Sequence, residues 1–149
     1  MTMTKNEKEL LLQDICSRLP HGIVVATIDN DGTIPNYWML DQYNRLTEDV
    51  RLTNCDVNAD RLTDFCDIRP YLFPLSSITE EQYYEMMGCS SDDCLEHMEL
   101  VKTLRNCTDF THWPLYEHRV IDWFNKNRFD YRGLIENGLA IDATGLNIY

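Results

Sequence analysis

Basic residues are scarce in this chain. It has 13 lysines and arginines against 25 aspartates and glutamates, and its formal net charge is −12. The acidic excess lies in residues 1–101, with seven basic and nineteen acidic residues, whereas residues 102–149 hold six of each. A surface of this charge repels nucleic acid and anionic lipid, and it attracts basic partners. The composition therefore argues against direct binding to nucleic acid or to a membrane.

Long hydrophobic runs are also missing. No apolar stretch approaches the roughly 20 residues that a membrane helix needs. The N-terminal segment has only three leucines in a row, followed by Gln13 and Asp14, and it lacks the pattern of a signal peptide. We therefore expect a soluble, cytoplasmic protein with reduced thiols. The six cysteines are Cys16, Cys55, Cys66, Cys89, Cys94 and Cys107.

Glycine and proline are few, at six and five residues, as expected for a globular chain. None of the glycines falls in a phosphate-binding pattern, and neither a nucleophile elbow nor a local cysteine-protease signature is present. Carboxylates are so abundant that no pair of them indicates acid–base catalysis. The sequence therefore favours a protein that is not an enzyme, and we expect no cofactor.

One group of residues has spacing close to that of a zinc site. Its potential ligands are Cys89, Cys94, His112 and His118. The spacing lies at the edge of the zinc-finger range, but the residues between the two pairs have the period of an amphipathic helix that needs a core. We assign no metal site, and a structural zinc-binding interaction domain stays open as an alternative.

The residue pattern predicts a single α+β domain, with an N-terminal helix, a small antiparallel sheet and C-terminal helices. Thr4 and Glu7 have capping-box spacing, which indicates a helix over residues 5–18. Residues 23–68 have short runs rich in β-branched residues, separated by turn signals such as Asp31-Gly32. We expect four or five strands there, in a sheet that can curl into a barrel.

The second half is predicted to be helical over about residues 79–137. Pro70 and Pro74 favour an extended connection before it, because each disfavours helix at the preceding residue. Thr79 and Gln82 again have capping-box spacing, so a helix should run from about Glu80 to Gly88. Two further helices are expected to begin near Asp92 or Asp93 and near Pro114.

The stretch FDYRGLIENGLA, residues 129–140, has the pattern of a short helix with both ends marked. Asp130 is a suitable N-cap, residues 131–137 provide about two turns, and Gly138 follows as the left-handed residue of a Schellman ending. That ending brings Leu134 and Leu139 into contact. Tyr131 and Arg132 are only partly explained by this pattern.

The acidic run after Pro74 has a functional interpretation. A surface of carboxylates can resemble nucleic-acid phosphates and occupy a basic cleft on another protein. We therefore expect a non-enzymatic acidic binding protein, although a solvated helix face explains the same residues. The expected contacts are Glu80, Glu81, Glu85, Asp92, Asp93, Glu96 and Glu99.

A second hypothesis is a protein that sequesters a small, nucleotide-type ligand. Arginine can lie over a ring system or bind a phosphate with two hydrogen bonds, which suits such ligands. The residues in question are Arg69, Tyr71, Tyr131 and Arg132.

Three stretches carry a resemblance to other proteins: LLLQDICSRLPHGIVV at 10–25, IRPYLFPLSSITEEQYYE at 68–85 and WFNKNRFDYRGLIENGLAIDAT at 123–144. They resemble a family of small proteins from gut anaerobic bacteria and their phages or mobile elements, for which no activity is known. The resemblance implies a cytoplasmic, phage-linked context. The partner would then be a host or phage protein with a basic surface, bound by an accessory or counter-defence factor.

Overall fold

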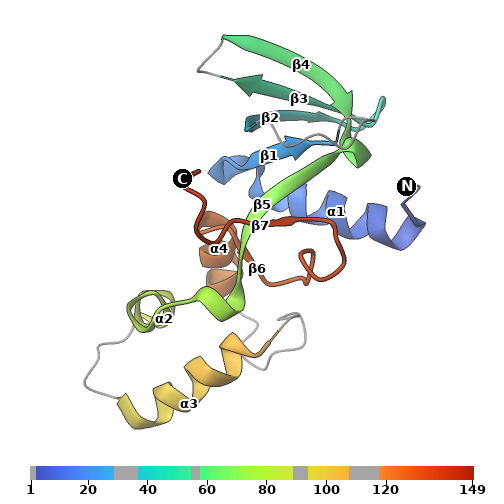
Figure 1. The fold of residues 1–149 in the computed structure, drawn as a ribbon. Coiled ribbons are helices and arrows are strands. Elements are labelled where there is room, and N and C mark those ends of the chain that lie inside the picture. The colour runs from blue at the N-terminus through green and yellow to red at the C-terminus, as the bar shows by residue number, and fades with distance from the viewer. Residues whose placement is uncertain (1–2, 29–36, 55–57, 89–93, 108–117) are drawn as a thin grey trace.

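The computed structural model describes residues 3–28, 37–54, 58–88, 94–107 and 118–149 (Figure 1). The helices are α1 (Lys5–Arg18), α2 (Glu80–Met87), α3 (Cys94–Arg105) and α4 (His118–Lys126). The strands are β1 (Val24–Thr27), β2 (Trp38–Asn44), β3 (Asp49–Asn54), β4 (Ala59–Asp64), β5 (Ile68–Pro74), β6 (Phe129–Asp130) and β7 (Ile141–Asp142). Both helices and a sheet are present, as the predicted α+β class requires.

The strands form one sheet in the order β4-β3-β2-β1-β5-β6, and β7 also pairs with β5. Neighbours from β4 to β5 are antiparallel, whereas β6 and β7 run parallel to β5. The sheet is therefore mixed and open, and it has more strands than the four or five expected. The predicted barrel is wrong, because β4 and β6 lie at opposite ends of the strand order. β6 and β7 have two residues each, too few to show an alternating pattern in the sequence.

The proline-containing segment is a strand inside the sheet rather than a connection. β5 pairs with β1 through residues 68–70, with β7 at residues 71–72 and with β6 at residues 73–74. β5 pairs with three short partners in turn. Pro70 and Pro74 have no N–H to donate, and each therefore removes a hydrogen bond from its ladder only locally. The fixed backbone angle of proline is also compatible with an extended strand.

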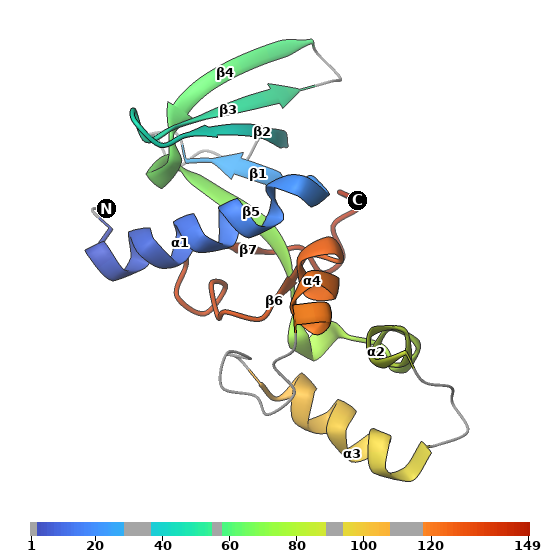
Figure 2. The same cartoon turned by 180° about the vertical axis from the view of Figure 1, so that it is seen from behind.

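Helix α1 covers one face of the sheet, as Figure 2 shows. Its start has both hydrogen bonds of the predicted capping box, between Thr4 and Glu7, and its bounds match the prediction. Leu11 and Ile15 on α1 are fully buried against the sheet, where Val50 and Leu52 of β3 are also fully buried. The alternation of buried and exposed residues along β3 leaves the opposite face of that strand to polar side chains.

A second core lies where the chain leaves the sheet. α2 and α3 are at the end of the molecule opposite β4, and α4 lies beside β6 (Figure 1). Their inner sides meet in one cluster that includes Leu75, Ile78, Tyr83, Met86, Val101, Leu104, Val120, Phe124, Phe129 and Tyr131. α2 has the predicted capping box and ends at Gly88 in the left-handed conformation. The expected cap at Asp92 or Asp93, the helix start at Pro114 and the turn at Asp31-Gly32 lie outside the described residues.

The stretch 131–137 is not the predicted two-turn helix, because only residues 134–138 form turns, and β6 interrupts the expected helical region. The predicted ending is nevertheless present. The N–H of Leu139 donates to the Leu134 carbonyl over 2.8 Å, and that of Gly138 donates to the Ile135 carbonyl over 3.1 Å, which is the Schellman pattern. Asp130 is not the predicted N-cap, since no helix follows it, but its carboxylate accepts from the N–H groups of Leu134 and Ile135.

Candidate functional site

The acidic face of α2 consists of Glu80, Glu81 and Glu85, all exposed to solvent. At 3.6 residues per turn, the three side chains lie within about 140° of arc around the helix axis. On the other side of the helix, Tyr83 and Met86 are 2% and 3% exposed. The helix is therefore held by its buried side, while its acidic face points to solvent.

Two arginines near α2 donate to main-chain carbonyls, one just before the helix and one at its end. Arg105 Nε donates to the Ile78 carbonyl over 2.9 Å, and Arg119 Nη2 donates to the Met87 carbonyl over 3.1 Å. Within the described ranges, the acidic face has no ion pair. Glu99 on α3 is exposed but pairs with Lys102 over 2.8 Å. Three predicted contacts, Asp92, Asp93 and the side chain of Glu96, lie outside the described residues.

Tyr131 and Arg132, two of the proposed ligand-binding residues, belong to an internal polar network. The Arg132 guanidinium lies 4.5 Å from the centre of the Tyr131 ring, and its Nη1 donates to Asp14 Oδ1 over 3.1 Å. The Tyr131 hydroxyl donates to Asn125 Oδ1 over 3.1 Å. Burial raises the pKa of Tyr131. These contacts engage both side chains within the protein.

The centre of this network is the ion pair of Asp14 and Arg18, whose side chains are both 0% exposed. Arg18 donates from Nε and Nη2 to the two carboxylate oxygens over 2.8 and 2.9 Å, and from Nη2 to the Phe129 carbonyl over 2.8 Å. Burial alone would lower the pKa of Arg18, but the charge and hydrogen bonds of Asp14 raise it overall. The pair links α1 to the C-terminal segment and has no solvent-exposed group to offer a ligand.

Arg69 and Tyr71, the other two proposed ligand residues, lie on β5. Arg69 donates to the carbonyls of Cys66 over 2.8 Å and Gly138 over 3.1 Å. Tyr71 is 1% exposed, and burial raises the pKa of its hydroxyl to about 12. It packs in a different apolar cluster from Tyr131. The structure thus brings Tyr131 and Arg132 together but does not place Tyr71 beside them.

The zinc alternative depends mostly on residues that the structure does not describe. Cys89 and His112 lie outside the described residues, and only the main chain of Cys94 is described, at the start of α3. His118 is exposed at the start of α4. Among the described side chains, no group of three or more potential ligands is placed to hold a metal ion. Cys16 and Cys66 are unbridged thiols.

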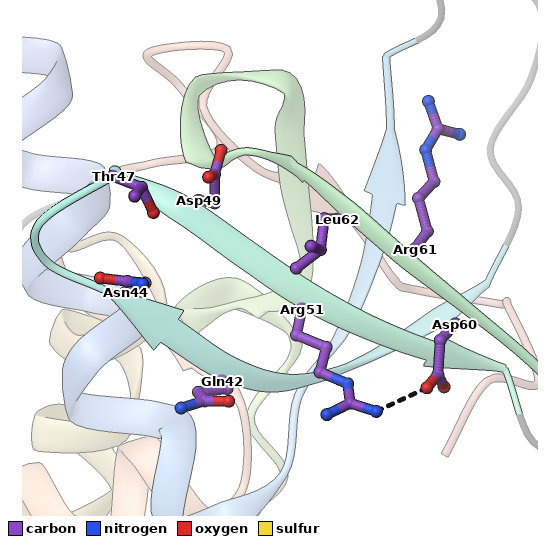
Figure 3. Close-up of a pocket in the computed structure, with 8 residues that line it drawn as sticks. All are labelled: Gln42, Asn44, Thr47, Asp49, Arg51, Asp60, Arg61 and Leu62. Atoms are coloured by element: carbon purple, nitrogen blue, oxygen red, sulfur yellow. Dashed lines mark hydrogen bonds and ion pairs between the residues drawn. The ribbon is translucent and has the colours of Figure 1, made fainter.

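A hollow of about 670 Å³ on β2, β3 and β4 was not anticipated from the sequence (Figure 3). Its described lining is Gln42, Asn44, Thr47, Asp49, Arg51, Asp60, Arg61 and Leu62. The Arg51 and Asp60 side chains form an ion pair of 2.6 Å across β3 and β4, while Arg61 extends away from that pair. The sequence predicts strands over residues 23–68, but not which of them lie side by side.

This hollow is suited to reversible contacts. It combines two guanidinium groups, two carboxylates, two amides and a hydroxyl with Leu62, which is 72% exposed. Arg51 and Asp60 are also about half exposed, at 48% and 56%, so solvent weakens their pairing. The described lining contains no histidine, cysteine or lysine. It is a second candidate contact surface, beside the acidic face.

Comparison with known proteins gives no relative. No protein-family model, curated protein or solved structure matches the chain. In the parts of the chain that the structure describes, no helix is long and apolar enough to cross a membrane. The resemblance to the family from gut bacteria and phages stays a prediction.

Proposed function

We propose that this protein is a non-enzymatic binding protein whose acidic face engages a basic surface of another protein. The observation that carries the proposal is the exposure of Glu80, Glu81 and Glu85 on one side of a helix that is fixed by its buried side. Following the resemblance, we propose that it acts as a phage-linked accessory or counter-defence factor on a host protein in the cytoplasm.

The electrostatics of the chain support this role. A net charge of −12 gives a long-range attraction for basic partners, which raises association rates at low salt. Arg105 and Arg119 come close to α2 but donate to carbonyls, so they leave its carboxylates available for contacts with a partner. Binding should therefore weaken as the salt concentration rises, because salt screens exposed charges.

The test is capture of a partner from bacterial lysate by wild-type protein and by two triple variants. One variant carries Glu80→Gln, Glu81→Gln and Glu85→Gln. The control carries Asp41→Asn, Asp67→Asn and Glu136→Gln, which removes the same charge from exposed positions elsewhere.

We expect salt-sensitive capture of a basic protein by the wild type and the control, and its loss with the first variant. Reversible folding of each variant should be verified first, because replacing Glu80 and Glu81 also removes favourable charges from the first turn of α2. Equal capture by all three proteins would show that the acidic face is not the contact.

A further inference from the structure

A smaller hollow, of about 350 Å³, lies between the end of β5, the start of α2, the turn from α4 to β6 and the turn after β7. Its described lining is Phe73, Ser77, Thr79, Gln82, Asn127, Arg128, Phe129, Thr144 and Gly145. It shares no described residue with the acidic face or with the hollow on the sheet. Its volume is at the lower end of the range for small-ligand pockets, about 300–1,000 Å³.

The chemistry of this lining differs from that of the rest of the molecule. Arg128 is the only charged residue among the described residues that line it, in a chain whose net charge is −12. Hydroxyl and amide side chains surround it, and no described carboxylate side chain lines the hollow to neutralise it. Such a lining favours a ligand that brings its own negative charge.

Arg128, in the turn between α4 and β6, is held in place by the ring of Tyr149. Its guanidinium carbon lies 4.1 Å from the centre of the Tyr149 ring, and the Tyr149 hydroxyl donates to the Tyr71 carbonyl over 2.9 Å. The backbone of Arg128 has a φ of +63°, which glycine adopts easily and arginine rarely. The arginine is thus anchored at a position where its backbone is unfavourable and where a glycine would fit better.

The donors of Arg128 are only weakly used. Nη1 donates to the Lys126 carbonyl over 3.3 Å and Nη2 to the His21 carbonyl over 3.5 Å, both long for hydrogen bonds. Nε is buried and has no hydrogen-bond partner among the described residues. A guanidinium has five N–H donors, and buried donors are normally satisfied. A ligand cannot reach the buried Nε, so the donors available to an oxyanion in the hollow are Nη1 and Nη2, whose present hydrogen bonds are long.

The apolar part of the lining defines the rest of the ligand. Phe73 is partly buried, and its ring centre lies 6.1 Å from that of the fully packed Phe129. The two rings offer an apolar wall beside the guanidinium. A ligand with a ring next to its charged group would contact both, with the charge at Arg128 and the ring at Phe73.

We propose that this hollow binds a small aromatic oxyanion, a phosphate ester or a carboxylate, with Arg128 holding the charged group. The amide and hydroxyl groups of Gln82, Asn127 and Thr144 are placed to complete its hydrogen bonds. This site does not depend on the acidic face, and it can hold a ligand whether or not a protein partner is bound.

Calorimetric titration with phenyl phosphate, benzoate, inorganic phosphate and the neutral phenol tests the site. We expect phenyl phosphate or benzoate to bind wild-type protein with a Kd below about 1 mM. Inorganic phosphate and phenol should bind more weakly, since phosphate lacks the aromatic ring and phenol lacks the negative charge. A preference for phenyl phosphate or for benzoate identifies the oxyanion, and either preference supports the proposal.

Three variants locate the binding. Arg128→Gln and Arg128→Gly should each weaken it about tenfold or more, because a charge-assisted hydrogen bond is lost. The glycine variant relieves the unfavourable backbone conformation at this position, and circular dichroism of both Arg128 variants separates loss of the ligand contact from loss of folding. Arg45→Gln removes the same charge from an exposed turn and should leave binding unchanged. Binding that survives in both Arg128 variants, or that is absent from wild-type protein, overturns the proposal.

Discussion

Replacing Asp14 by asparagine should destabilise the protein strongly, because it removes the negative charge from the centre of the buried network. Asp14 Oδ1 accepts hydrogen bonds from Arg18 and Arg132, and Oδ2 accepts one from Arg18 Nε over 2.8 Å. An asparagine has nearly the same size but presents an NH₂ group where a carboxylate oxygen now accepts. One fully buried guanidinium would be left without its counter-charge.

The magnitude follows from the burial of both partners. Breaking a buried ion pair by removing one partner costs about 3–5 kcal/mol, a large part of the stability of a typical domain. The Arg51–Asp60 pair is the matched control, since its 2.6 Å distance is shorter but its side chains are 48% and 56% exposed. Asp60→Asn should cost at most about 1 kcal/mol, as exposed pairs do.

Urea unfolding followed by circular dichroism measures both effects as changes in the midpoint, provided that the slope with denaturant is unchanged. A double variant, Asp14→Leu with Arg18→Met, should be closer to wild type than Asp14→Asn, because it leaves no buried charge at position 18. If Asp14→Asn and Asp60→Asn lose the same stability, the reasoning from burial is refuted.

Three further changes test single features of the fold. Gly138→Ala should cost about 1–2 kcal/mol in urea unfolding, because Gly138 has a φ of +69° and no atom lies within 4 Å of the added carbon; an unchanged midpoint would contradict the Schellman ending. Thr4→Ala should cost about 0.5–2 kcal/mol by the same measurement, through loss of the capping box of α1, and a more stable variant would argue against that role. Burial raises the pKa of Asp130 above its ordinary value of 3.8, so the folded state binds this proton more tightly than the unfolded state. Wild type should therefore gain stability relative to Asp130→Asn as the pH falls through the raised pKa toward 3.8, and a difference that stays constant with pH would show that Asp130 does not titrate in this way.

The features that were predicted correctly depend on residues close together in the chain. Thr4 with Glu7 and Thr79 with Gln82 are three residues apart, and both capping boxes are present. Gly138 ends its turn with the two expected hydrogen bonds, because a left-handed residue has few alternatives at that position. The helix expected before it did not form over residues 131–137, where Tyr131 and Leu134 are buried and only residues 134–138 form turns.

The features that were missed depend on distant parts of the chain. Arg18 donates to the Phe129 carbonyl across a separation of 111 residues, and no local pattern indicates such a contact. β6 and β7 are strands only because β5 supplies their hydrogen bonds. The two hollows likewise combine side chains from several elements, so strand order and helix packing had to be known before either could be identified.

The sequence by itself determined the net charge, the starts of α1 and α2 and the Schellman ending at Gly138. Each of these depends on composition or on residues within a few positions of one another. Only the tertiary structure decided that the sheet is open and mixed, that Arg132 and Tyr131 serve an internal network, and that Arg128 faces a hollow lined without described carboxylate side chains. The physical reason is that side-chain contacts across the sheet and between helices depend on packing, which local preferences do not specify.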